Sequence, residues 1–187
     1  MDAVWQNTLK NHADTLRAVE NDMALNERIT ESAAVISEAL KKGNKVVIFG
    51  NGGSAADAQH IAAEFVGRFR RERKAMNVFA LTGNTAVLTS VANDYDYGAV
   101  FERQVETFLG KGDIAIGITT SGKSENVLRA LEKAKEKGAF TIAMTGESPE
   151  LNFVHLIIDI PSPVTSHVQE MHMMIGHYWA DYTEQNM

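Results

Sequence analysis

Residues 50–64 read Gly-Asn-Gly-Gly-Ser-Ala-Ala-Asp-Ala-Gln-His-Ile-Ala-Ala-Glu, and they directly follow the apolar run Lys-Val-Val-Ile-Phe at 45–49. The β-branched and aromatic residues of that run predict a buried strand. The glycines after it permit a tight turn with positive φ and a close approach of the backbone to a ligand. Ser54 suits the N-cap of an alanine-rich helix. A strand, a glycine turn and a helix N-terminus together predict a site for an anion or a sugar.

Two polar side chains follow on the same expected helix. His60 and Glu64 are four residues apart, so they are expected to share one face, one turn below the loop. This spacing places a base and a potential metal ligand near the polar turn. The alternative is a glycine turn that only packs the helix, with two surface polar residues.

The composition excludes several classes of protein. The chain has 187 residues, 44% hydrophobic and 22% charged, which is typical of one soluble globular domain, with or without a helical appendage. There is no cysteine, which excludes disulfides and thiolate chemistry, so any metal must be held by His, carboxylate or amide groups. A net charge of -6 argues against a general nucleic-acid binder, and no apolar stretch approaches membrane length. We therefore expect a cytoplasmic protein without nucleic-acid or membrane partners.

The rest of the chain alternates between helical and strand patterns. Two amphipathic helices are expected at 2–22 and 26–42, before the first strand. Further strands are predicted at 77–81, 114–118, 139–145 and 154–160, further helices at 85–92, 100–109, 125–137 and 166–184, and a loop with a helical turn at 146–151. This alternation predicts a parallel sheet with helices on both faces. One small sheet cannot cover both leading helices, which predicts packing against another subunit.

Some side chains allow two interpretations. The helix that follows the first loop is expected to end in a cluster of cations, which are Arg68, Arg70, Arg71, Arg73 and Lys74. We interpret these side chains as a solvated helix end, where the helix dipole favours positive charge. The alternative is attraction of a phosphorylated substrate, which is strongest for Arg68. Asp94 is either a ligand for sugar hydroxyls or a turn carboxylate. We interpret His12 and His155 as structural, and Met173 and Met174 as core packing.

A second loop, Thr-Thr-Ser-Gly-Lys-Ser at 119–124, lies between a strand and a helix and offers hydroxyls and backbone N–H groups to a phosphate. Together with Gly117 it also satisfies the P-loop pattern of nucleotide-binding enzymes, and residues 156–159 could act as the magnesium-binding strand. However, Gly117 is flanked by isoleucines as in a strand, and few residues follow Ser124. A nucleotide site would also leave the first loop without a role. An NTPase is the least favoured function.

Taken together, these motifs resemble the sugar isomerase (SIS) fold and, within it, the bacterial phosphoheptose isomerases. The resemblance extends over nearly the whole chain and is most specific at 50–60, 64–65, 92–95, 120–124 and 168–177. It implies an α/β three-layer sandwich with a five-stranded parallel sheet, a single SIS domain over 1–187, and a homotetramer that uses the helical pair at 1–43. The implied reaction converts sedoheptulose 7-phosphate to D-glycero-D-manno-heptose 7-phosphate, for heptose synthesis in lipopolysaccharide or related glycans.

The resemblance also implies roles for individual residues. Glu64 and His177 match the catalytic pair, and the implied substrate-binding residues are Asn51, Gly52, Gly53, Ser54, Asp94, Thr119, Thr120, Ser121, Ser124 and Gln169. One zinc ion per active site is implied, at subunit interfaces, with the ligands His60, Glu64, Gln169 and His177. Thr119 stands where many relatives have Ser, and Ser166 and His167 replace an acidic and a basic residue, which affects contacts to sugar hydroxyls.

The chemistry and the spacing leave alternatives open. Isomerisation through an enediol needs a base and an acid, which we assign to Glu64 and His177. A zinc-bound carboxylate is a weaker base, so Glu64 acts either as a free base or as a ligand. Gln169 and His177 lie about 12 Å apart along a straight helix, so one zinc takes them from different subunits or the helix bends. The alternative function is a non-catalytic SIS adaptor or a sugar-phosphate sensor; the adaptor that resembles these isomerases lacks this carboxylate and this last histidine.

Overall fold

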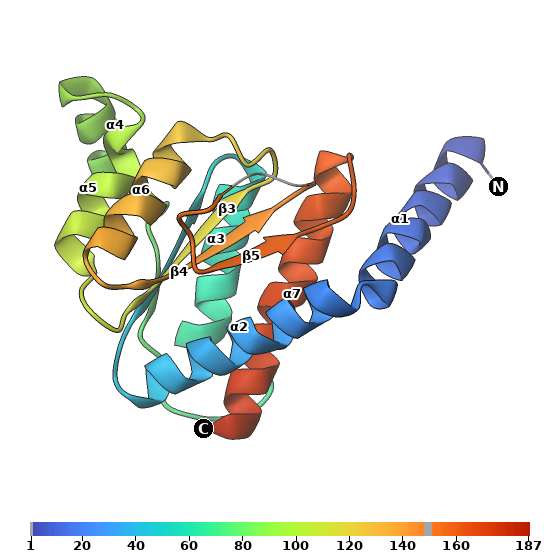
Figure 1. Cartoon of the computed structure of the whole chain (residues 1–187), viewed down its shortest axis with the longest axis horizontal. Coiled ribbons are helices and arrows are strands. Elements are labelled where there is room, and N and C mark those ends of the chain that lie inside the picture. Colours follow the sequence, from blue (N-terminus) through green and yellow to red (C-terminus); the bar gives the residue numbers. More distant parts are fainter. Residues whose placement is uncertain (1, 148–150) are drawn as a thin grey trace.

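The computed structural model describes residues 2–147 and 151–187 and shows a sheet between two layers of helices (Figure 1). The strands β1 (Val46–Gly50), β2 (Val78–Ala80), β3 (Ile114–Thr119), β4 (Phe140–Thr145) and β5 (Leu156–Asp159) are all parallel, in the order β2-β1-β3-β4-β5. The described residues also form the helices α1 (Ala3–Asn21), α2 (Met23–Lys41), α3 (Gly53–Val66), α4 (Thr85–Asp94), α5 (Ala99–Phe108), α6 (Glu125–Glu136) and α7 (Thr165–Asn186). The predicted architecture is confirmed.

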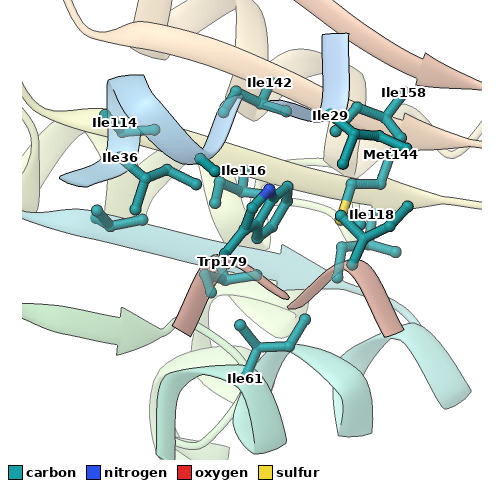
Figure 2. Close-up of a cluster of buried hydrophobic side chains, with 14 of the residues drawn as sticks. Ile29, Ile36, Ile61, Ile114, Ile116, Ile118, Ile142, Met144, Ile158 and Trp179 are labelled. Atoms are coloured by element: carbon teal, nitrogen blue, oxygen red, sulfur yellow. The ribbon is translucent and has the colours of Figure 1, made fainter. Parts of the chain in front are cut away.

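The central strands are apolar on both faces because each face is covered. Val46 and Ile48 of β1 join a core with α2, α3 and α7, whereas Val47 and Phe49 join a second core with α5 and α6. Figure 2 shows Trp179 of α7 among isoleucines of the first core. Its indole Nε1 donates to the Ser32 hydroxyl at 2.7 Å, so this fully buried side chain leaves no donor unpaired.

Several element ends differ from the prediction. The second helix begins at Met23, because Asp22 ends α1 and its carboxylate caps Leu25 N at 2.9 Å. The last strand is shorter than 154–160. His155 precedes it, stacks on Phe140 and accepts a hydrogen bond from the Thr141 backbone at 3.1 Å, in agreement with a structural role. Of the predicted loop at 146–151, residues 148–150 lie outside the described residues.

Ser54 is not the N-cap of α3, contrary to the prediction. The cap is Gly52, whose φ of 57° is strained for any residue with a side chain. Ser54 lies in the first turn and is 3% exposed. A Cβ at Gly50 would lie only 2.8 Å from Ser54 Cβ and from the Ile118 carbonyl oxygen, so the end of β1 accommodates only glycine.

The strand order creates a switch point between β1 and β3. The chain leaves β1 through α3 toward β2 on one side, and it leaves β3 through α6 toward β4 on the other side. Gly50 and Ile118 are register partners at the carboxyl ends of these two strands. Loops that diverge from neighbouring strands open a crevice at this switch point, which is the usual ligand site of open α/β sheets.

Helix α1 extends away from the rest of the chain (Figure 1). It has apolar side chains that remain exposed, namely Val4 (73%), Trp5 (54%), Leu9 (48%) and Leu16 (45%). By contrast, α2 buries Leu25, Ile29 and Ile36 against the sheet. No described helix combines the length and the apolar character needed to cross a bilayer.

Candidate functional site

Two hydroxyl-bearing loops meet at the switch point. Thr119 ends β3, and its hydroxyl donates to the Ser124 hydroxyl at 3.1 Å. In the same loop the Lys123 backbone N–H donates to the Ser121 hydroxyl at 3.2 Å, and Gly122 takes a φ of 65°. Thr120 continues the loop, and the N-terminus of α6 follows directly. Helix N-termini favour anions through their dipole and free N–H groups, so this arrangement suits a phosphate.

Gly117 belongs to the sheet and does not open a phosphate loop. It pairs with Phe49 and Ala143 on the neighbouring strands. A Cβ there would lie 2.8 Å from side-chain carbons of Val127 and Leu131, so the glycine lets α6 pack closely on β3. This packing role explains the match to the P-loop pattern without a nucleotide.

Asn51 is held in place by two residues that the sequence analysis did not identify. Its side chain exchanges two hydrogen bonds with the side chain of Asn126, at 2.8 and 2.9 Å. The Tyr97 hydroxyl donates to Asn51 Oδ1 at 3.0 Å. The network joins the first loop to α6 and to the segment before α5. No sequence pattern predicts it, because its members come from three separate elements.

The structure brings His60, Glu64 and His177 together. His60 Nε2 lies 3.1 Å from Glu64 Oε1 and 3.3 Å from His177 Nε2. One ligand atom from each residue lies within 4.8 Å of the other two. The first two residues share a face of α3, as their spacing predicts, and the third comes from α7, which runs beside it.

The spacing of these three groups fits a metal. A tetrahedral zinc with bonds of about 2.0–2.1 Å separates its ligand atoms by about 3.3 Å. The distances from His60 Nε2 to Glu64 Oε1 (3.1 Å) and to His177 Nε2 (3.3 Å) are close to this value. Two imidazoles and a carboxylate are also a common zinc donor set. The residues present therefore provide three corners of such a site.

Gln169 lies elsewhere on the same helix. Its amide lies against Gly53 at the start of α3, where a Cβ would overlap it. Helix α7 is uninterrupted between Gln169 and His177, so the two residues lie about 12 Å apart along it. Both side chains line one open hollow of about 460 Å³, together with Asp57, Ser166, Glu170, Met173 and Met174. Met174 is 43% exposed there, so the predicted core role is wrong for this residue.

Asp57 is a further polar residue of this hollow that the sequence analysis did not identify. Its Oδ2 is buried and has no hydrogen-bond partner among the described residues. Burial raises the pKa of Asp57 above its ordinary value, and the nearby His60 offsets this only in part. Burial of a carboxylate oxygen without a partner favours the neutral form of the group, in agreement with the raised pKa.

Two candidate residues lie apart from this cluster. Asp94 ends α4, and its carboxylate accepts a hydrogen bond from the neighbouring Asn93 side chain at 2.9 Å. Helix α4 lies with α5 and α6 on one face of the sheet, whereas α7 packs on the other face (Figure 1). Arg68 is 64% exposed, and Glu72 lies 4.0 Å from it. Both proposed substrate contacts remain predictions.

An α/β fold with two hydroxyl-bearing loops at the switch point, and a cluster of one carboxylate and two imidazoles on α3 and α7, is typical of proteins that act on sugar phosphates. The comparisons agree: residues 9–146 match the SIS domain family. A phosphoheptose isomerase from Aquifex aeolicus (strain VF5) is 51% identical over 85% of this chain and 84% of its own length. One from Clostridium acetobutylicum is 46% identical over 96% and 92%, respectively. The solved phosphoheptose isomerase from Francisella tularensis is 32% identical and covers 99% of this chain and 100% of its own, with a TM-score of 0.93. The chain belongs to the SIS domain family and, within it, to the phosphoheptose isomerases.

Proposed function

We propose that the protein is an aldose–ketose isomerase that converts sedoheptulose 7-phosphate to D-glycero-D-manno-heptose 7-phosphate in heptose biosynthesis. The observation that carries this proposal is the approach of Glu64 and His177 to one another from separate helices. A seven-carbon sugar phosphate has its phosphate at one end and its carbonyl near the other. One end suits the loops and the other suits the acid–base pair.

We assign the proton transfers to Glu64 and His177. Glu64 removes the proton from C1 of the ketose and returns it to C2, so that a cis-enediol forms and collapses to the aldose. The proton that the C2 oxygen gains comes from His177, and the proton that the C1 hydroxyl loses returns to it, so the enzyme ends unchanged. Two positioned groups of this kind each contribute about 10²–10⁴-fold to such reactions. Thr119, Ser121 and Ser124 hold the phosphate and keep the reacting carbons between the two groups.

As the alternative to free acid–base catalysis by Glu64 and His177, we propose one zinc ion per active site, held by His60, Glu64 and His177, with Gln169 from a neighbouring subunit as a fourth ligand. The distances given above support three of these ligands. A zinc ion polarises oxygen atoms as a Lewis acid. We test this by isothermal titration of zinc into chelator-treated protein. We expect His60→Gln to weaken zinc binding by at least about tenfold. Glu170 is the control residue: it is exposed and pairs with His12, and its replacement should leave zinc binding unchanged.

The site would be shared between subunits of a homotetramer. Two observations support this proposal: the exposed apolar face of α1, and the position of Gln169 more than two turns of α7 before His177. We propose a cytoplasmic location, because a phosphorylated sugar carries charge that keeps it from crossing membranes.

The decisive experiment is incubation of the purified protein with sedoheptulose 7-phosphate, with and without a chelator, followed by detection of the aldose. We expect turnover by the wild-type protein and a loss of at least about 100-fold in kcat for Glu64→Gln and for His177→Gln. Glu72→Gln, the same change at a 91% exposed side chain, is the matched control. Absence of wild-type turnover would favour a sugar-phosphate sensor or adaptor. Stabilisation by nucleotides would favour the NTPase.

A further inference from the structure

The segment between α3 and β2 is attached to the end of α7 by one buried carboxylate. Glu184 accepts hydrogen bonds from the backbone N–H groups of Phe69, Arg70 and Arg71, at 2.7, 2.8 and 3.0 Å. Its side chain is only 1% exposed. Burial acts to raise the pKa of Glu184, but these three hydrogen bonds and the charge of Arg73 outweigh it and lower the pKa. The carboxylate is therefore ionised and firmly held.

Arg73 connects this carboxylate to the helix that carries Glu64. Its Nε lies 3.2 Å from Glu184 Oε1, and its side chain is 12% exposed. The guanidinium also donates to the carbonyl oxygens of Glu64 at 2.7 Å and Phe65 at 2.6 Å. A planar fork of five N–H donors suits this role, which satisfies carbonyl groups at the C-terminus of α3. The Arg73–Glu184 pair thus joins the ends of α3 and α7.

Phe69 connects the Arg73–Glu184 pair to His177. Its ring stacks on the His177 imidazole, with 5.4 Å between centroids and 23° between planes. The guanidinium of Arg70 lies 5.2 Å from the Phe69 centroid. The ring therefore forms one wall against His177, while His60 contacts the same imidazole.

We propose that Phe69, Arg73 and Glu184 are positioning residues that set the placement of His177 relative to Glu64. Arg73 binds the backbone of Glu64, Glu184 binds the backbone of Phe69, and the Phe69 ring packs on His177, so one continuous set of contacts connects the two proposed catalytic groups. The proposal rests on the isomerase function proposed above. A buried ion pair such as Arg73–Glu184 contributes little net stability compared with apolar side chains, but its hydrogen bonds restrict the orientation of the groups that it joins.

The location of the unit formed by Phe69, Arg73 and Glu184 predicts which kinetic constant changes when one of these residues is replaced. The unit lies at the C-terminal end of α3, whereas the phosphate-binding loops adjoin the N-terminal ends of α3 and α6. A displacement of about 1 Å at the reacting groups costs up to about 100-fold in rate. The phosphate-binding loops are not displaced, so binding of the phosphate group is unchanged. Loss of the unit therefore lowers kcat and leaves KM nearly unchanged.

The first test removes the ring. We expect Phe69→Leu to lower kcat by about tenfold with KM within about twofold of the wild-type value, and Phe69→Tyr to restore kcat because it keeps a ring. Phe108→Leu is the matched control, since Phe108 is 48% exposed and stacks on Phe79 at the sheet edge. Unchanged kcat in Phe69→Leu would overturn the proposal.

The second test does not depend on turnover. The NMR signals of the His177 ring are shifted by the ring current of Phe69, so Phe69→Leu moves them. We expect Glu184→Gln to move them in the same direction, because Phe69 loses its anchor, and the exposed Glu72→Gln to leave them in place. His177 signals that do not respond to Glu184→Gln would overturn the positioning role. A wild-type protein without turnover would refute the isomerase function alone, since these signals still report the contact.

Discussion

His172 of α7 packs against β4 and does not belong to the proposed catalytic site. It is fully buried, and its Nε2 lies 3.1 Å from the Thr145 carbonyl oxygen, to which it must donate. The other ring nitrogen has no partner among the described residues. Burial lowers the pKa of His172 to about 4, although the hydrogen bond to Thr145 acts in the opposite direction. The imidazole is therefore neutral in the folded protein at pH 7.

This histidine predicts a loss of stability in mild acid. In the unfolded chain its pKa is about 6.5, so the unfolded state binds a proton first as the pH falls. The contribution is fully present above pH 6.5 and is lost as the pH falls toward 4, the folded pKa. We expect the free energy of unfolding to fall by about 2 kcal/mol from this group between pH 7 and pH 5.

Urea denaturation of the wild-type protein and of His172→Leu, at both pH values, isolates this contribution. The Thr145 carbonyl oxygen still accepts a hydrogen bond from Ile160 N at 3.0 Å, so the variant leaves it satisfied. The variant should lose about 2 kcal/mol less than the wild type on acidification. Equal losses in both proteins would show that other groups cause the pH dependence.

At the scale of single residues, the sequence predicted what depends on local spacing. The shared face of His60 and Glu64 follows from a separation of four residues, and the structure places them 3.1 Å apart. Contacts between distant residues gave no such signal. Phe69 meets His177, and Glu184 meets the loop at 69–71, across more than 100 positions of sequence. The function of Arg73 could not be separated from that of its exposed neighbours, because only tertiary burial distinguishes it.

At the scale of elements, the approach of α3 to α7 depends on one glycine. Gly176 lies next to His177 on α7, and a Cβ there would come within 2.5 and 2.6 Å of Ile61 Cγ1 and Cδ1 on α3. Ile61 in turn follows His60. The two imidazoles can therefore meet because the helices touch closely at this point.

Gly176→Ala should move the two helices apart. We expect a loss of about 1–3 kcal/mol in the free energy of unfolding, as for overpacking of a core, and a lower kcat with nearly unchanged KM. In a double-mutant cycle, Ile61→Ala removes the clashing atoms, so the methyl group should cost less in that background. Gly83→Ala is the control, since a Cβ at Gly83 meets open space. Additive losses in the cycle would contradict this account.

The order and type of the elements were predictable, whereas some of their ends were not. Strand and helix periods repeat clearly in this sequence, and the sheet of five parallel strands follows from their alternation. The N-cap of α3 was assigned to Ser54 by side-chain preference, but the positive φ at Gly52 moves the helix start. The close packing of Gly50 against Ser54 and Ile118 decides that geometry, and it is a tertiary contact.

At the scale of the whole molecule, α1 predicts an assembly. Its exposed apolar side chains would be costly to leave in water, and a second copy of the chain offers a cover for them. We expect Leu9→Asp to shift the protein to a smaller species in size-exclusion chromatography with light scattering. Asn7→Asp introduces the same side chain at an exposed polar position of α1 and should leave the mass unchanged. An unchanged mass for Leu9→Asp would exclude α1 as the contact.

Subunit mixing tests whether neighbouring chains share the active site. If each site takes Glu64 and His177 from one chain and Gln169 from its neighbour, an inactive Gln169→Ala protein and an inactive His177→Gln protein complement each other. In a mixed pair, the Gln169→Ala chain keeps its catalytic pair and receives an intact glutamine from the other chain. Random exchange makes about half of the pairs mixed, each with one working site, so activity should return to about a quarter of the wild-type value.

The matched control is a mixture of Glu64→Gln with His177→Gln. These two residues come from the same chain, where they flank His60 within 4.8 Å, so every site in a mixed pair still lacks one of them. That mixture should stay inactive. Activity restored in both mixtures would mean that Glu64 and His177 also come from different chains, and activity restored in neither would mean that each chain builds its site alone. Recovery in the first mixture only is the result that a shared glutamine requires, since α7 holds Gln169 and His177 about 12 Å apart.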